Sequence, residues 1–186
     1  MAAPREHNPR RLDVAAFATA GTELQGQAPL ADLPRLAESA VAAESAPLVS
    51  WRAQGERKTR VGAPAEIWLH LHAAVEMPLE CQRCLAPVTA PVEVDRRLRF
   101  VDGGEAAAAA LDADSEDDVL PLSRSLDLIE LVEDELLLAL PIVPRHEVCP
   151  KPLPVPAAAP AQPDADNEPA KPNPFAALAK LKKAGD

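Results

Sequence analysis

The sequence predicts an α+β fold in which an antiparallel β-hairpin sheet packs against one long helix. Two alternating segments on either side of residues 81–84 predict the hairpin, and an apolar stripe at helical spacing between residues 126 and 140 predicts the helix. A proline-rich segment that begins at residue 150 marks the end of the folded core. We therefore expect a core domain at residues 10–149, preceded by a disordered N-terminus at residues 1–9.

Alternation with a period of two defines both predicted strands. The first strand has an apolar face of Ile67, Leu69, Leu71, Ala73 and Val75, opposite Trp68, His70, His72 and Glu76. The second has an apolar face of Val88, Ala90, Val92, Val94, Leu98 and Phe100, opposite Thr89, Glu93, Asp95, Arg97 and Arg99. Only Arg96 interrupts the second apolar row. Because successive side chains of a strand point to opposite faces, each strand can bury one row, and Cys81 and Cys84 then lie near the tip of the hairpin.

Capping signals bound the long helix at Leu126–Leu140. Ser125 offers an N-cap, and Pro141 ends the helix. The apolar stripe consists of Leu128, Ile129, Val132, Leu136, Ala139 and Leu140, and the other side carries Asp127, Glu130, Glu133 and Asp134. The segment Leu33–Ala43 predicts another helix, which is entered at Asp32 and has Pro34 in its first turn.

Residues 102–125 predict a flexible acidic loop. This segment contains Gly103-Gly104, five consecutive alanines and the acidic run Asp112–Asp118. Such a composition buries little apolar surface, so we expect no regular structure there.

The C-terminal part predicts a linker at residues 150–172 and a short helix at residues 173–183. Asn173 can cap that helix, and Pro174 suits its first position. Its apolar stripe is Phe175, Leu178 and Leu181, and its basic residues are Lys180, Lys182 and Lys183. A helix this short is marginal alone, because isolated helices need ~12–15 residues. We therefore expect it to bind a partner.

Charge is distributed unevenly along the chain of 186 residues. The formal net charge is −10, and residues 101–150 hold 13 Asp/Glu against 2 Lys/Arg, whereas residues 1–100 are balanced at 12 of each. This pattern argues against a general nucleic-acid binder but leaves local contacts open. No apolar run approaches the ~20 residues of a membrane span. An odd cysteine number and the short, alanine-rich stretch Val14–Ala20 favour a cytoplasmic protein over an exported one.

Two short motifs predict a structural zinc site. Cys81 and Cys84 have the C-x2-C spacing that brings two thiolates to one metal ion, and His146 and Cys149 can supply the other two ligands. The alternative is that these residues are ordinary reduced thiols in turns. A redox role is disfavoured, because no βαβ pattern surrounds the cysteine pair.

Basic residues form a candidate RNA or partner contact. Arg97 and Arg99 share the polar face of the predicted hairpin, and Arg83 lies at its tip. The alternative is a solvated face, which also accounts for His70 and His72. No phosphate-binding loop or nucleophile-and-base set occurs, so the sequence predicts neither an enzyme nor a small-molecule substrate.

Several motifs together resemble the YceD family of large ribosomal RNA subunit accumulation proteins. The resemblance lies in Leu79–Cys84 (LECQRC), Leu131–Pro144 (LVEDELLLALPIVP), Lys171–Ala179 (KPNPFAALA) and, more weakly, Arg35–Ser39 (RLAES). Some relatives carry a second cysteine pair after the helix, where this chain has His146 and Cys149. The resemblance implies a ribosome biogenesis factor for the synthesis, processing or stability of large-subunit (23S) ribosomal RNA. It implies no enzymatic activity.

Three functions from different classes therefore remain to be weighed. The favoured one is a non-catalytic factor whose partner is large-subunit ribosomal RNA, a ribosomal protein or an assembly factor. The alternatives are a zinc-dependent protein-interaction module that acts outside the ribosome and an RNA-processing enzyme.

Overall fold

The computed structural model describes residues 7–42, 46–59, 61–62, 64–113 and 115–150. The chain divides into two units, Met1–Pro152 and Leu153–Asp186, and all described residues belong to the first. The linker predicted at 150–172 lies outside the described residues from Lys151 onward. So does the helix predicted at 173–183, with its Phe175, Leu178 and Leu181 stripe and its Lys180, Lys182 and Lys183 side chains.

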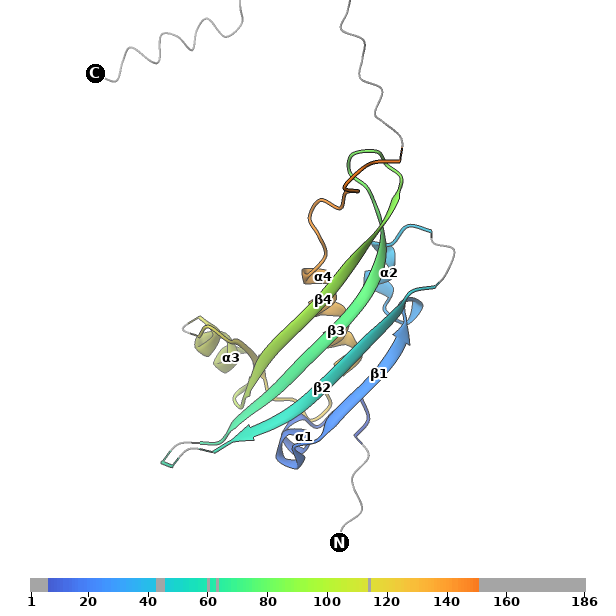
Figure 1. Ribbon diagram of the computed structural model, residues 1–186. Helices are drawn as coiled ribbons and strands as arrows, with labels where there is room; N and C mark the ends of the chain where they lie inside the picture. Colours follow the sequence, from blue (N-terminus) through green and yellow to red (C-terminus); the bar gives the residue numbers. More distant parts are fainter. Residues whose placement is uncertain (1–6, 43–45, 60, 63, 114, 151–186) are drawn as a thin grey trace, which may run out of the picture. The chain divides into compact units, whose positions relative to one another are not determined.

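A five-stranded sheet confirms the predicted α+β class. The strands are β1 (Glu23–Pro29), β2 (Leu48–Lys58), β3 (Glu66–Glu80), β4 (Pro87–Val101) and β5 (Asp118–Pro121), in the spatial order β1-β2-β3-β4-β5. Each of the first four strands is antiparallel to its neighbour, and β5 is parallel to β4 (Figure 1). The helices α2 (Pro34–Glu38) and α4 (Leu128–Leu138) lie on the same side of this sheet.

The β3–β4 hairpin has the predicted faces, and its register is continuous along both strands. Ile67 pairs with Phe100 at one end, and Glu80 pairs with Pro87 beside the tip. Arg96, which breaks the apolar row, lies opposite α4, where its Nε donates to Glu135 Oε2 at 3.2 Å. The break in the pattern is therefore one half of an ion pair between sheet and helix.

Trp68 lies on the polar face of the sheet, as predicted, but it is buried there. Lys58 Nζ lies 4.7 Å from the centroid of the indole ring, and Arg97 Cζ lies 5.0 Å from it. Cations attract the negative face of an aromatic ring, so these two long side chains cover the tryptophan.

The long helix is shorter than predicted at both ends. Asp127 is the N-cap of α4, with Oδ1 accepting from the N–H groups of Ile129 and Glu130. The prediction that Ser125 caps the helix is wrong, because Leu126 instead pairs with Leu12 through two backbone hydrogen bonds. Residues 7–9 also belong to the domain and are not disordered: Pro9 O accepts from Leu128 N at 2.7 Å.

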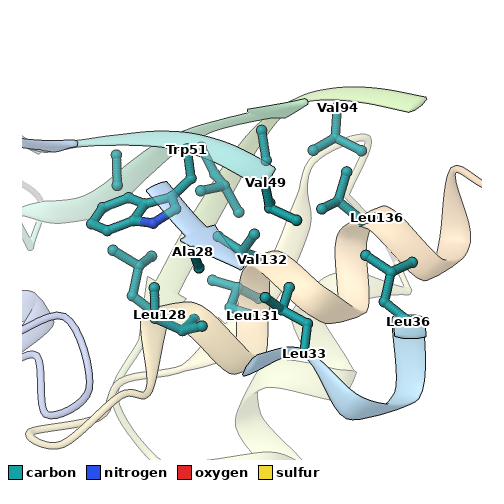
Figure 2. Close-up of a cluster of buried hydrophobic side chains, with 14 of the residues drawn as sticks. Ala28, Leu33, Leu36, Val49, Trp51, Val94, Leu128, Leu131, Val132 and Leu136 are labelled. Atoms are coloured by element: carbon teal, nitrogen blue, oxygen red, sulfur yellow. The ribbon is translucent and has the colours of Figure 1, made fainter. Parts of the chain in front are cut away.

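The core lies between α4 and the sheet. Figure 2 shows side chains of α4 (Leu128, Val132 and Leu136) and of the segment around α2 (Leu33 and Leu36) facing side chains of the strands (Val49, Trp51 and Val94). A further helix, α1 (Val14–Ala20), starts at the N-cap Asp13 and buries Phe17. Its close approach explains Gly55 in β2, because a Cβ at that position would lie 2.8 Å from the Ala18 backbone.

The segment 102–125 is not the flexible loop that the sequence predicted. Its alanines lie in α3 (Gly104–Asp112), and Asp118–Pro121 form the edge strand β5. Alanine has the highest intrinsic helix propensity, and Gly103 and Gly104 supply the positive φ angles of the turn into α3. Ala108 and Val119 are buried, so the segment packs against the sheet edge.

The helix predicted at Leu33–Ala43 extends only over Pro34–Glu38, with the one-turn 3₁₀ helix η1 (Leu30–Asp32) before it. Its first residue is preceded by Leu33, which offers no side-chain cap. Glu133 of α4 takes that place by accepting hydrogen bonds from Arg35 N and Leu36 N. Glu133 is therefore buried, although it lies on the side of the helix opposite the predicted apolar stripe.

Within the described ranges, no helix has both the length and the apolar character that crossing a bilayer requires.

Candidate metal centre

The tip of the β3–β4 hairpin meets the chain that follows α4. Residues 81–86 form the turn, in which Leu85 N donates to Cys81 O at 2.9 Å and Cys81 N donates to Ala86 O at 3.0 Å. Gln82 N then donates to Pro144 O at 2.9 Å. This last bond holds the residues just before His146 against the turn.

All four predicted ligands come together at this place. One ligand atom from each of Cys81, Cys84, His146 and Cys149 lies within 4.8 Å of every other, and this is the one such group of three or more potential ligands in the described part of the chain. Cys81 is buried, and the other three are partly buried. The two pairs of ligands, Cys81 with Cys84 and His146 with Cys149, are far apart in the sequence: Cys84 and His146 are separated by 62 positions.

The spacing of the donor atoms fits a tetrahedral metal site. Cys81 Sγ lies 3.9 Å from Cys149 Sγ, and Cys84 Sγ lies 3.5 Å from His146 Nδ1. A zinc ion with Zn–S bonds of ~2.3 Å and Zn–N bonds of ~2.0–2.1 Å has tetrahedral edges of about 3.8 Å between two sulfurs and about 3.6 Å between sulfur and nitrogen. These two distances match such edges, and all four donor atoms lie close enough together to hold one metal ion.

The electrostatics of the cluster favour one thiolate and resist a second. Burial disfavours the Cys81 thiolate, but backbone hydrogen bonds at His146, Arg83 and Cys84 outweigh burial and lower the pKa of Cys81 to about 5. For Cys84 the backbone hydrogen bond at Ala86 acts in the same direction, yet burial and the neighbouring thiols raise its pKa. Crowded thiolates repel each other, and a bound cation removes that repulsion.

Arg83 belongs to this cluster. Its Nε donates to Cys149 Sγ at 3.0 Å, and its Nη2 donates to His146 O at 2.8 Å and to Glu147 O at 3.2 Å. The hydrogen bond to Cys149 raises the pKa of Arg83. Arg83 lies at the tip of the hairpin, as predicted. Its contacts with residues 146–149 were not predicted, and the only sequence feature that points to them is the position of Arg83 between the two cysteines.

The other two predicted basic residues lie elsewhere. Arg97 and Arg99 share the outer face of β4, where Arg97 covers Trp68 and Arg99 Nη2 lies 3.8 Å from Glu66 Oε1. Arg97 follows Pro87 by ten positions, which at ~3.3 Å per residue places it about 33 Å along the strand from the tip. The structure therefore does not unite Arg83, Arg97 and Arg99 into one basic stripe.

The two histidines of β3 pair with acidic residues on neighbouring strands. His70 Nε2 lies 3.2 Å from Glu56 Oε2, and His72 Nε2 lies 3.8 Å from Glu93 Oε1. Both imidazoles are partly exposed on the outer face of the sheet, as predicted for the solvated side of an amphipathic strand.

The comparisons with known proteins identify a family for the chain. No solved structure matches the chain. The family model described as "Large ribosomal RNA subunit accumulation protein YceD" matches residues 69–182, which is more than half of the chain and includes all four clustered ligands. The chain therefore belongs to the YceD family, whose description supports a role connected with large-subunit ribosomal RNA.

Proposed function

We propose that the protein is a non-catalytic, cytoplasmic factor that supports the synthesis, processing or stability of large-subunit ribosomal RNA. The observation that carries this proposal is the family match over residues 69–182. Its partner is the ribosomal RNA itself, a ribosomal protein or an assembly factor.

Zinc is the metal that the donor set fits best. A set of three thiolates and one imidazole is typical of structural zinc sites, and the four donor atoms here lie within 4.8 Å of one another. With all four positions supplied by the protein, such a site has no open position for a substrate or a reactive water. This arrangement favours a structural ion, which would join the hairpin tip to the chain after α4.

Deletion of the gene tests the proposed role. We expect the amount of large-subunit ribosomal RNA to fall relative to small-subunit RNA, and the wild-type chain supplied in trans should restore it. RNA quantification under slow and fast growth measures the ratio. An unchanged ratio in both conditions contradicts the assignment.

The second candidate is a zinc-dependent protein-interaction module that acts outside the ribosome. Exposed apolar side chains near the cluster favour it: Leu85 is 69% exposed and Val148 is 86% exposed. Sedimentation of cell extracts on ribosome gradients separates the two candidates. A ribosome factor should migrate in part with large-subunit particles, whereas an extra-ribosomal module should stay at the top of the gradient.

A further inference from the structure

Arg83 occupies an unusual position for a basic residue, between two cysteines and against the third. We propose that Arg83 is a positioning residue that assembles the two halves of the metal centre and slows the loss of the ion. This inference rests on the proposed metal site, and it assigns to Arg83 a role different from RNA binding.

The first contribution of Arg83 concerns charge. A zinc ion with three thiolates and a neutral imidazole carries a net charge of −1, and the cluster is at least partly buried. The guanidinium of Arg83 brings the compensating positive charge to 3.0 Å from Cys149 Sγ. Hydrogen bonds between ionised partners are stronger than neutral ones, so this contact compensates the net negative charge of the metal-bound cluster.

The second contribution concerns assembly. The same side chain donates through Nη2 to the carbonyl oxygens of His146 and Glu147, so one guanidinium holds both the backbone and the sulfur of the second motif. The planar, forked guanidinium can make these bonds together, whereas a lysine ammonium cannot match their geometry. Arg83 thereby aligns His146 and Cys149 with the Cys81–Cys84 turn before the ion arrives, which lowers the ordering required on binding.

Three variants of the full-length chain separate these contributions. Arg83→Met removes the charge and all three hydrogen bonds but keeps a long side chain. Arg83→Lys keeps the positive charge but lacks the forked guanidinium that makes the three hydrogen bonds together. Arg145→Met is the matched control, because Arg145 is exposed, adjoins His146 and makes no hydrogen bond to the cluster in the described structure.

Zinc affinity and release are measured by competition with a chelator. Partners that orient metal ligands commonly change affinity by roughly 10–100-fold, so we expect Arg83→Met to weaken zinc binding within that range. Arg83→Lys should fall between it and the wild type, and Arg145→Met should stay within about twofold of the wild type. Suppose that the wild-type chain binds zinc. The role of Arg83 is then overturned if Arg83→Met binds zinc as tightly as the wild type does, or if Arg83→Lys does so. A wild-type chain that binds no zinc overturns the metal site as well.

Cobalt substitution supplies a readout that a merely structural role would not move. Removal of an N–H donor from a coordinated thiolate makes the sulfur a better electron donor. The sulfur-to-cobalt charge-transfer band should therefore shift to longer wavelength in Arg83→Met, and less in Arg83→Lys. An identical spectrum in the folded, cobalt-loaded Arg83→Met chain contradicts a contact between Arg83 and the ligand sulfur.

Discussion

Glu133 connects two helices through a single buried carboxylate. Oε1 accepts from the backbone N–H groups of Arg35 and Leu36 at 2.7 and 3.1 Å, and Oε2 accepts from the Arg35 guanidinium at 2.9 and 3.1 Å. Its side chain is only 6% exposed. A carboxylate can be buried at such a place because each oxygen has donors, and it then serves as the N-terminal cap that α2 lacks in its own sequence.

Replacement of Glu133 by Gln should destabilise the domain. The amide has only one acceptor oxygen, so its NH2 group would face the donors of Arg35 or the backbone. Hydrogen bonds to charged groups are worth about 1.5–3 kcal/mol, and we expect a loss of that size in the free energy of unfolding. Denaturant titration measures it, with the exposed Glu130→Gln on the same helix as control. Equal stability of the two variants contradicts the capping role of Glu133.

At the scale of elements, α4 depends on one residue at its start. Asp127 accepts two backbone hydrogen bonds with Oδ1, and its Oδ2 lies 3.5 Å from Arg10 Nη1. The carboxylate is also placed favourably for the helix dipole.

Asp127→Ala should lower the free energy of unfolding by about 1 kcal/mol, as the loss of an N-cap does. Ser125→Ala is the control, since the sequence alone gives Ser125 and Asp127 the same capping chemistry, but only Asp127 caps α4. Thermal or denaturant unfolding of the two variants measures the difference. A larger effect at Ser125 contradicts the helix boundary.

The strength of the hydrophobic pattern in each segment explains which strands could be predicted from the sequence. The β3–β4 hairpin was predicted because its apolar rows are long and contain several large residues, whereas the core faces of β1 and β2 include small residues (Gly26, Ala28, Ala53 and Gly55) that give little signal. Gly26 of β1 shows the reason: a Cβ there would lie 2.7 Å from the Trp51 ring, so the strand must present a bare backbone. The burial of Glu133 was not predictable, because its partner Arg35 lies 98 residues away in the sequence.

The candidate site was predicted in part for a similar reason. The four ligands follow from the spacing of two short motifs. The contacts of Arg83 do not, because they form only after the fold has brought residues 146–149 to the turn.

At the scale of the whole molecule, a bound ion should contribute to stability. Purified protein should contain zinc near one ion per chain, because four ligands close one site. Cys84→Ser should lose the ion and unfold at a lower temperature, since metal binding by such sites is coupled to folding. Metal analysis and thermal unfolding, with and without chelator, check both expectations. If the purified wild type contains no metal and melts at the same temperature as Cys84→Ser, the four residues are ordinary thiols and an imidazole and form no metal site.

The C-terminal residues lie outside the described structure and remain a sequence-based prediction. Burial of Phe175, Leu178 and Leu181 against a partner is worth ~1.5–3 kcal/mol each before ordering, enough for a specific but modest contact. Truncation after Ala170 should therefore leave the melting temperature of the domain unchanged while the cellular function fails. A drop of several degrees would instead assign the segment to the fold.

The bond network at the hairpin tip also determines where a mechanical load enters the protein. Residues 81–84 and 146–149 are joined side by side, so α3, β5 and α4 lie within a closed ring of chain. Tension applied to the chain beyond Pro150 reaches this junction before it reaches α4, and from there it passes into β3 and β4, which are paired over 14 residue positions. We therefore expect a pull on residue 150 to load the hairpin before it loads α4.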